Sequence, residues 1–262
     1  MSKESVFQEL ARRVSYFRAS SVAPADEGWI GCGSLVAGGA PLAELIAQTG
    51  RGRGTEDQQV AASLFVQAYA FRLGSIVLGA FALELSIPDP QPSDTAIRID
   101  RHRPGAIAFL GDELGPLDAH DVARVLLAEH CAPLIAAVRE CVTVGERLLW
   151  GNVAASCAVV FRALDTAVET SPATPAERTA LHASTLLHQR ADALFLAAAP
   201  WLDGLGAFET VVTPVRTGWY WNRTSCCLWY AAVGGTTCDD CSLLDRDTLA
   251  ERRRDELTKA MT

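Results

Sequence analysis

The stretch VAASLFVQAYAFRLGSIVLGAFALEL, residues 60–85, decides the fold class because it is apolar on most sides of a helix. Such a helix is buried, either among other helices or in a membrane. Gln67, Arg72 and Glu84 argue against a membrane span, since a central arginine costs roughly 2.5 kcal/mol or more on insertion scales. No flanking basic cluster sets an orientation across a bilayer. We therefore predict a core helix over residues 56–85 of a mainly α-helical protein.

Helical patterns continue on both sides of this stretch. Apolar residues at positions 6, 10, 14 and 17 lie on one face of an amphipathic first helix. Thr174, Pro175 and Glu177 form a capping box, with proline at the first helical position. Pro133 is expected to kink or split the helix that contains it. The further expected helices cover residues 41–48, 118–144, 146–169, 174–199 and 245–261.

The β structure is expected to be minor. Residues 96–110, AIRIDRHRPGAIAFL, form two short apolar runs around Pro104 and Gly105, which predicts a small hairpin turning at those two residues. Apolar residues between 208 and 215 suggest one further strand. The segment 20–55 is rich in glycine, alanine and proline, and is interpreted as a largely irregular connection around the short helix at 41–48.

Composition narrows the class of protein. The chain has 262 residues, of which 49% are hydrophobic, enough for a sizeable core. A net charge of -8 excludes the basic surface that nucleic-acid binding requires. The charged first residues, MSKESVFQELARR, lack the apolar run of a secretory signal, so we expect a cytoplasmic protein. Because thiols stay reduced there, the eight cysteines are more consistent with ligands and buried thiols than with disulfides.

The chemistry concentrates in residues 223–241, RTSCCLWYAAVGGTTCDDC. Four thiols in this segment suit either tetrahedral zinc or an iron-sulfur cluster. Structural zinc sites usually separate the two cysteines of each pair, whereas adjacent cysteines tend to point apart, which a wider two-iron centre accommodates more easily. The pattern therefore favours a [2Fe-2S] cluster bound by Cys226, Cys227, Cys238 and Cys241.

Residues around these cysteines are candidates for tuning the site. The Gly234-Gly235 pair gives the chain freedom to turn around the cluster. Asp239 and Asp240 lie between two ligands, and their charge should lower the reduction potential. Arg223 would act oppositely, or would contact an acidic donor or the substrate; the simpler interpretation is a solvated surface arginine.

Three tryptophans, Trp219, Trp221 and Trp229, are candidate walls of a substrate groove, with aromatic core packing as the alternative. A basic group on the expected hairpin, Arg98, Arg101, His102 and Arg103, is a candidate contact for a partner or substrate. The remaining cysteines, scattered along apolar segments, are expected to be buried free thiols. They are Cys32, Cys131, Cys141 and Cys157.

The cysteine spacing, together with Leu228 and Tyr230 after the adjacent pair, resembles the C-terminal signature of FhuF-like ferric siderophore reductases. The resemblance is specific over 223–241 and weaker upstream, at Arg72-Leu-Gly74 and Leu149-Trp-Gly-Asn152. It implies a [2Fe-2S] protein that reduces iron(III) in hydroxamate siderophores inside the cell and releases iron(II). It also implies an iron-sulfur module, residues 216–262, that is loop-rich and follows a mainly helical body, residues 1–215.

The resemblance also bears on partners. The sequence contains neither the dinucleotide-binding fingerprint nor a P-loop, so electrons should come from a ferredoxin, a flavodoxin or an NAD(P)H-dependent reductase. Transient association with the inner face of the membrane or with a siderophore transporter is expected on the same grounds. Two other functions remain open: a structural protein clipped by zinc, and a cluster-bearing sensor or binding protein without turnover.

Overall fold

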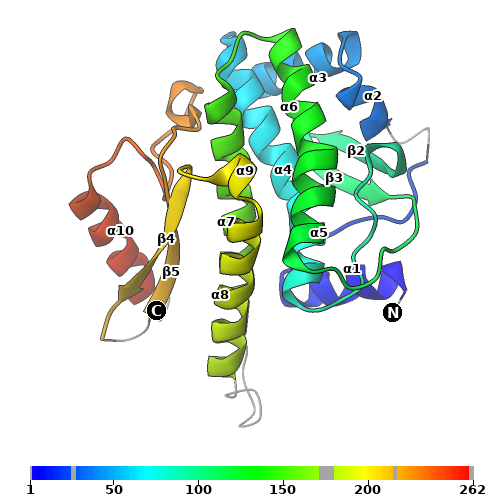
Figure 1. Cartoon of the computed structure of the whole chain (residues 1–262). Helices are drawn as coiled ribbons and strands as arrows, with labels where there is room; N and C mark the ends of the chain where they lie inside the picture. Colours follow the sequence, from blue (N-terminus) through cyan, green and yellow to red (C-terminus); the bar gives the residue numbers. More distant parts are fainter. Residues whose placement is uncertain (1, 25–27, 171–179, 215–216, 260–262) are drawn as a thin grey trace.

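A computed structural model describes residues 2–24, 28–170, 180–214 and 217–259 of the chain. It is mainly α-helical with two small antiparallel sheets, as the sequence predicts (Figure 1). The α-helices are α1 (Lys3–Arg13), α2 (Cys32–Val36), α3 (Ala40–Gly52), α4 (Gln58–Ala82), α5 (Ala119–Ala123), α6 (Ala132–Cys141), α7 (Glu146–Thr170), α8 (Ala180–Ala197), α9 (Ala199–Leu202) and α10 (Arg246–Lys259). The other helical turns are η2 (Pro92–Asp94), the π-helix η3 (Arg124–Cys131) and η5 (Trp229–Ala231).

Helices α4 and α7 form the centre of the molecule, where they pack along each other. The Asp57 side chain begins α4 by accepting hydrogen bonds from the amides of Gln59 and Val60. Both helices are long and apolar enough to cross a membrane by length and composition alone, yet 72% of the apolar window in α4 and 78% of that in α7 are buried within the protein. Burial in the core accounts for their composition without a bilayer.

The first sheet has strand order β1 (Trp29–Gly31), β2 (Thr95–Asp100) and β3 (Arg103–Phe109). The predicted hairpin is present, but its turn was predicted wrongly. Arg101 and His102 form the turn, with φ of 48° and 62°, and Asp100 pairs with Arg103. Gly105 lies inside β3, where a Cβ atom would overlap the side chain of Asp100. The glycine thus serves close strand packing, and two residues that seldom adopt positive φ make the turn.

Two other predictions for the helical body need correction. The segment 20–55 is more regular than predicted, because it contains β1, α2 and the full length of α3. Pro133 produces no sharp break: it occupies the first turn of α6, directly after the π-helical turns of η3. The predicted capping box at 174–177 lies outside the described residues, and α8 ends at Ala197, before the short helix α9.

The C-terminal part joins the body through a hairpin of β4 (Gly206–Val212) and β5 (Thr217–Arg223). The prediction covered β4 only. Figure 1 shows this hairpin and α10 on one side of α7 and α8. Seven residue pairs join the two strands, so the expected boundary at 215/216 falls between two paired strands. Trp219 and Trp221 on β5 belong to the same hydrophobic core as α4 and α7.

Candidate metal centre and adjacent pocket

The fold brings the four predicted cysteine ligands together from two loops. Cys226 and Cys227 follow β5, and Cys238 and Cys241 precede α10. The sulfur atoms of Cys227 and Cys238 are 3.1 Å apart without a disulfide between them. Burial and the charges of Cys227 and Cys241 raise the pKa of Cys226. The two cysteine pairs therefore lie near each other, with direct sulfur contact between Cys227 and Cys238.

Protonation differs between the two sulfurs in contact. A hydrogen bond from Cys238 lowers the pKa of Cys227 to about 6. The same hydrogen bond raises the pKa of Cys238 well above its ordinary range. Thiolates are the form that binds metals and clusters, so metal binding would release the protons that these sulfurs still carry.

The donor set fits a two-iron cluster. Cys227 contacts Cys238, whereas the sulfur of its neighbour Cys226 accepts a hydrogen bond from the Leu228 amide at 3.3 Å. Four thiols supply the complete ligand set of a [2Fe-2S] cluster, and the same set would also suit tetrahedral zinc. Within the described ranges, no group of three cysteine, histidine or acidic side chains is arranged so that it could hold a metal ion.

The predicted surface position of Arg223 is wrong, because only 5% of this residue is exposed. Its Nη2 donates to Oδ1 of Asn152 at 2.6 Å, and its Nε donates to the Ser225 carbonyl at 2.5 Å. Its charge lowers the pKa of Cys227. In the described part of the chain, Nη1 of Arg223 and the hydroxyl of Ser225 are buried without a hydrogen-bond partner. An anionic cluster would supply the acceptor that this buried cation lacks.

Two buried polar residues fix the first cysteine loop to the central helices. The Ser63 hydroxyl on α4 donates to the Cys227 carbonyl at 2.7 Å. Asn152 on α7 donates to the Ser63 hydroxyl at 2.8 Å while it accepts from Arg223. Next to it, a Cβ atom at Gly151 would overlap the Ser225 hydroxyl. In the segment Leu149-Trp-Gly-Asn152, Asn152 thus bonds the residues that hold the cysteine loop, and Gly151 leaves room for Ser225.

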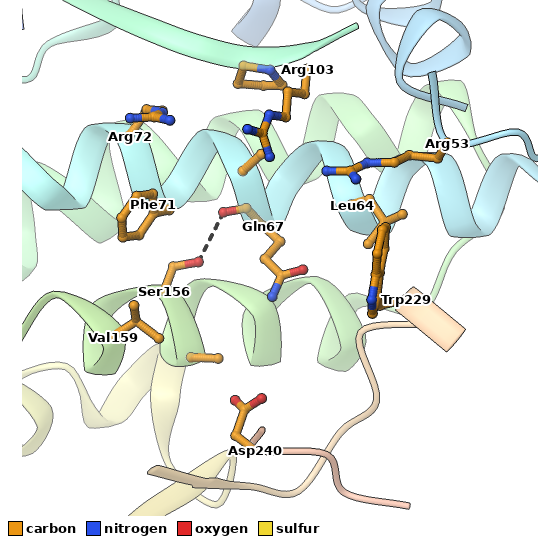
Figure 2. A pocket seen from close by; sticks show the side chains of 13 residues that line it. Arg53, Leu64, Gln67, Phe71, Arg72, Arg103, Ser156, Val159, Trp229 and Asp240 are labelled. Carbon is orange, nitrogen blue, oxygen red and sulfur yellow. Dashed lines mark hydrogen bonds between the residues drawn. The ribbon is translucent and has the colours of Figure 1, made fainter. Parts of the chain in front are cut away.

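A pocket of about 450 Å³ lies beside the cysteine loops, over α4 and α7 (Figure 2). Trp229 and Asp240, which come from those loops, line one part of it. In Figure 2, Arg53, Arg72 and Arg103 project from the side opposite Asp240. The lining is completed by small and apolar residues and two polar ones: Leu64, Gln67, Ala68, Phe71, Pro104, Ala155, Ser156 and Val159.

Of the residues predicted to contact substrate or a partner, Trp229 and Arg103 line this pocket and the others do not. Trp219 stacks on Phe208 with ring centroids 3.7 Å apart, and Trp221 packs against Phe195 at 4.8 Å. Both are buried in the core, because they lie two residues apart on β5 and so share the face of the hairpin that packs against α8. Trp219 and Trp221 therefore pack in the core, which was the alternative to their role as groove walls. Arg223 bonds the Ser225 carbonyl and so holds the first cysteine loop.

Sequence reasoning missed most of the pocket. Arg53 and Arg72 lie far from the cysteines in the chain, and nothing in the sequence indicates that they meet Arg103. The available signal was Arg72 itself, a charge inside an otherwise apolar helix. Such a residue usually faces a cavity or partner.

Three of the other four cysteines are buried as predicted, whereas Cys141 is only partly buried. Cys32, Cys131 and Cys157 are buried, and burial raises the pKa of Cys157 to about 12. Their thiols are protonated at neutral pH and belong to neither of the two cysteine pairs. The four-cysteine pattern is the feature that indicates a function, and its similarity to FhuF-like reductases stays a prediction. The chain matches no protein-family model, no curated protein and no solved structure at a significant level.

Proposed function

We propose that this protein is a ferric siderophore reductase that carries a [2Fe-2S] cluster on Cys226, Cys227, Cys238 and Cys241. The observation that carries the proposal is that residues of the two cysteine loops also line the neighbouring pocket. Asp240 lies between two of the ligands and Trp229 two residues after another, and both line the cavity of about 450 Å³. A chelate in this cavity would contact the loops that hold the cluster.

When bound, a [2Fe-2S] cluster accepts one electron from a donor and gives one electron to the iron(III) of the chelate, which becomes iron(II). This one-electron step needs no proton-abstracting side chain. Siderophore ligands hold iron(II) far less tightly than iron(III), so reduction would release the metal without breaking the ligand. The electron would come from a separate protein carrier, a ferredoxin, a flavodoxin or an NAD(P)H-dependent reductase.

The chain's own residues would stabilise and tune the cluster. Arg223 places a buried positive charge near the thiolates, and its free Nη1 faces no described acceptor. The Leu228 amide donates to the Cys226 sulfur at 3.3 Å. Both features stabilise added negative charge and raise the reduction potential, while Asp239 and Asp240 act in the opposite direction. Trp229 would limit the access of water from the pocket side.

The first experiment tests the cluster. Protein purified without oxygen from iron-replete cells should be brown-red and contain iron and acid-labile sulfide in equal amounts. Cys238→Ser should abolish or destabilise the visible spectrum. Cys141→Ser is the matched control, since Cys141 bonds only the Gly39 carbonyl at 3.8 Å among the described residues and lies outside the two cysteine pairs. Colourless protein that contains zinc, or no metal, would support the structural role and contradict the proposal.

The second experiment tests turnover. The reduced protein would be mixed with ferric siderophores in a stopped-flow instrument, with iron(II) trapped by a chromogenic chelator. A reductase returns to its oxidised spectrum in step with the appearance of iron(II). A sensor or binding protein keeps its reduced spectrum while iron(II) fails to appear, and that result would contradict reductase activity but leave the cluster assignment intact.

A further inference from the structure

Three arginines from separate parts of the chain meet on one side of the pocket. Arg53 follows α3, Arg72 lies in α4, and Arg103 begins β3. Figure 2 shows all three on the side opposite Asp240. The apolar residues along α4 and α7 form the floor between them. The pocket is therefore cationic on one side, has Asp240 on the other, and is mostly apolar along the two helices, where Gln67 and Ser156 are polar.

No carboxylate in the described residues forms an ion pair with any of these arginines. Burial and the charge of Arg103 lower the pKa of both Arg53 and Arg72. Asp100 offsets this effect in part at Arg72 only. Like charges held together without counterions are unfavourable, and a bound anion relieves that repulsion.

Two of the arginines are held in place by packing. The guanidinium of Arg53 lies 4.6 Å from the ring centroid of Trp229, so it links the arginine group to the cluster loop. Arg72 donates to the Tyr16 carbonyl at 3.3 Å and lies 5.6 Å from the ring centroid of Phe71. Each keeps donor groups for a ligand, because a guanidinium has five donors.

Arg103 is positioned by the unusual turn that precedes it. Arg101 and His102 both have positive φ, a conformation that a non-glycine residue keeps only when its surroundings require it. His102 packs so closely on Gly52 that a Cβ atom there would overlap its side chain. This contact joins the hairpin to the end of α3, next to Arg53, and so fixes two of the three arginines relative to each other.

We infer that this pocket selects ferric chelates that carry net negative charge, such as tris-catecholate complexes, over neutral ones. The inference rests on the proposed reductase function and specifies its substrate class. Three hydroxamate groups, each with one negative charge, only neutralise iron(III), whereas catecholate groups, each with two, leave the complex anionic. Arginines recognise such oxygen-rich anions through charge-assisted hydrogen bonds. The prediction from the sequence resemblance was the hydroxamate class.

The test measures binding without electron transfer. Gallium(III) has the charge of iron(III) but is not reduced, so its tris-catecholate and tris-hydroxamate complexes would be titrated into the cluster-loaded protein by calorimetry. The anionic complex should bind at least about tenfold more tightly, and its affinity should fall as salt increases. Arg103→Gln should weaken the anionic complex about tenfold or more and leave the neutral one nearly unchanged. Arg124→Gln is the control, because it removes the same charge from an arginine that pairs with Asp121 and Glu129 and does not line the pocket.

Equal affinity for the two complexes, binding of neither, or an unchanged affinity in Arg103→Gln would overturn the inference. A protein that reduces ferric siderophores yet shows equal affinity for both gallium complexes would contradict this inference alone. A protein that prefers the anionic gallium complex but reduces no ferric siderophore would contradict the proposed function and leave the charge selection in place.

Discussion

Individual residues between the two cysteine pairs have strict backbone requirements. Leu228 adopts φ of 63° and Gly234 φ of 71°, both in the left-handed region. At Gly235 a Cβ atom would overlap the Trp229 carbonyl oxygen and approach the Ala232 carbonyl oxygen. The turn η5 and the chain that leaves it are therefore packed backbone against backbone, which only glycine permits at that point.

Replacing Gly235 by alanine should deform this loop. Backbone atoms cannot move aside as a flexible side chain can, so we expect a loss of about 1–3 kcal/mol in stability and most of the cluster absorbance. Gly145→Ala is the control, because nothing lies within 4 Å of a Cβ atom built there. Iron content and the thermal midpoint of both variants check this. Wild-type iron content in Gly235→Ala would show that the loop is looser than its packing indicates.

Helices α4 and α7 hold the first cysteine loop through a buried polar pair, Ser63 and Asn152. Ser63 and Asn152 are both fully buried. Together they connect the Cys227 carbonyl to Arg223. A buried polar network of this kind positions a loop only when every member has its partner.

Asn152→Ala should therefore affect both stability and cluster binding. It removes the acceptor of Nη2 of Arg223 and a donor to Ser63, and an unsatisfied buried charged group costs about 3 kcal/mol or more. Asn222→Ala, whose bond to Glu209 is exposed, should cost less than about 0.5 kcal/mol. Urea unfolding and the visible spectrum would measure the two effects. Equal small losses in both variants would contradict the supporting role of Asn152.

At the scale of the whole molecule, one buried histidine connects α4 to the π-helical segment η3. The Nε2 atom of His130 lies 2.7 Å from the Tyr69 hydroxyl, and its Nδ1 contacts the Pro90 carbonyl. Because a carbonyl can only accept, Nδ1 carries the proton and Nε2 accepts from Tyr69, which describes a neutral ring. Burial lowers the pKa of His130 from 6.5 to about 4.

This histidine should make stability depend on pH. The His130 ring binds a proton near pH 6.5 in the unfolded chain but only near pH 4 in the folded chain. The contribution of neutral His130 to the free energy of unfolding is therefore fully present above pH 6.5 and is lost as the pH falls toward 4. Between pH 7.5 and 5 the loss should be about 2 kcal/mol in urea unfolding. His130→Gln cannot titrate, so its stability should change less over this range. A pH dependence identical to that of the wild type would refute the assignment.

Local patterns predicted much of the fold and brought attention to the two cysteine pairs, for reasons visible at particular residues. The run at 60–85 is apolar on most sides, which predicts a buried helix, and most residues of α4 are indeed buried in the core. The four cysteines are close in sequence, so loop closure alone brings them near one another. The hairpin turn was misplaced because Arg101 and His102 contain no turn signal, and packing against α3 imposes their positive φ.

By itself, the sequence determined the helical class, the buried helices and the set of cysteines that can hold a cluster, because these depend on periodicity and short spacing. Only the tertiary structure decided that Arg223 is buried, that Trp219 and Trp221 pack in the core, and that Arg53, Arg72 and Arg103 share a pocket. The physical reason is distance along the chain. Contacts between segments dozens of residues apart arise from packing the whole molecule, and no local pattern encodes them.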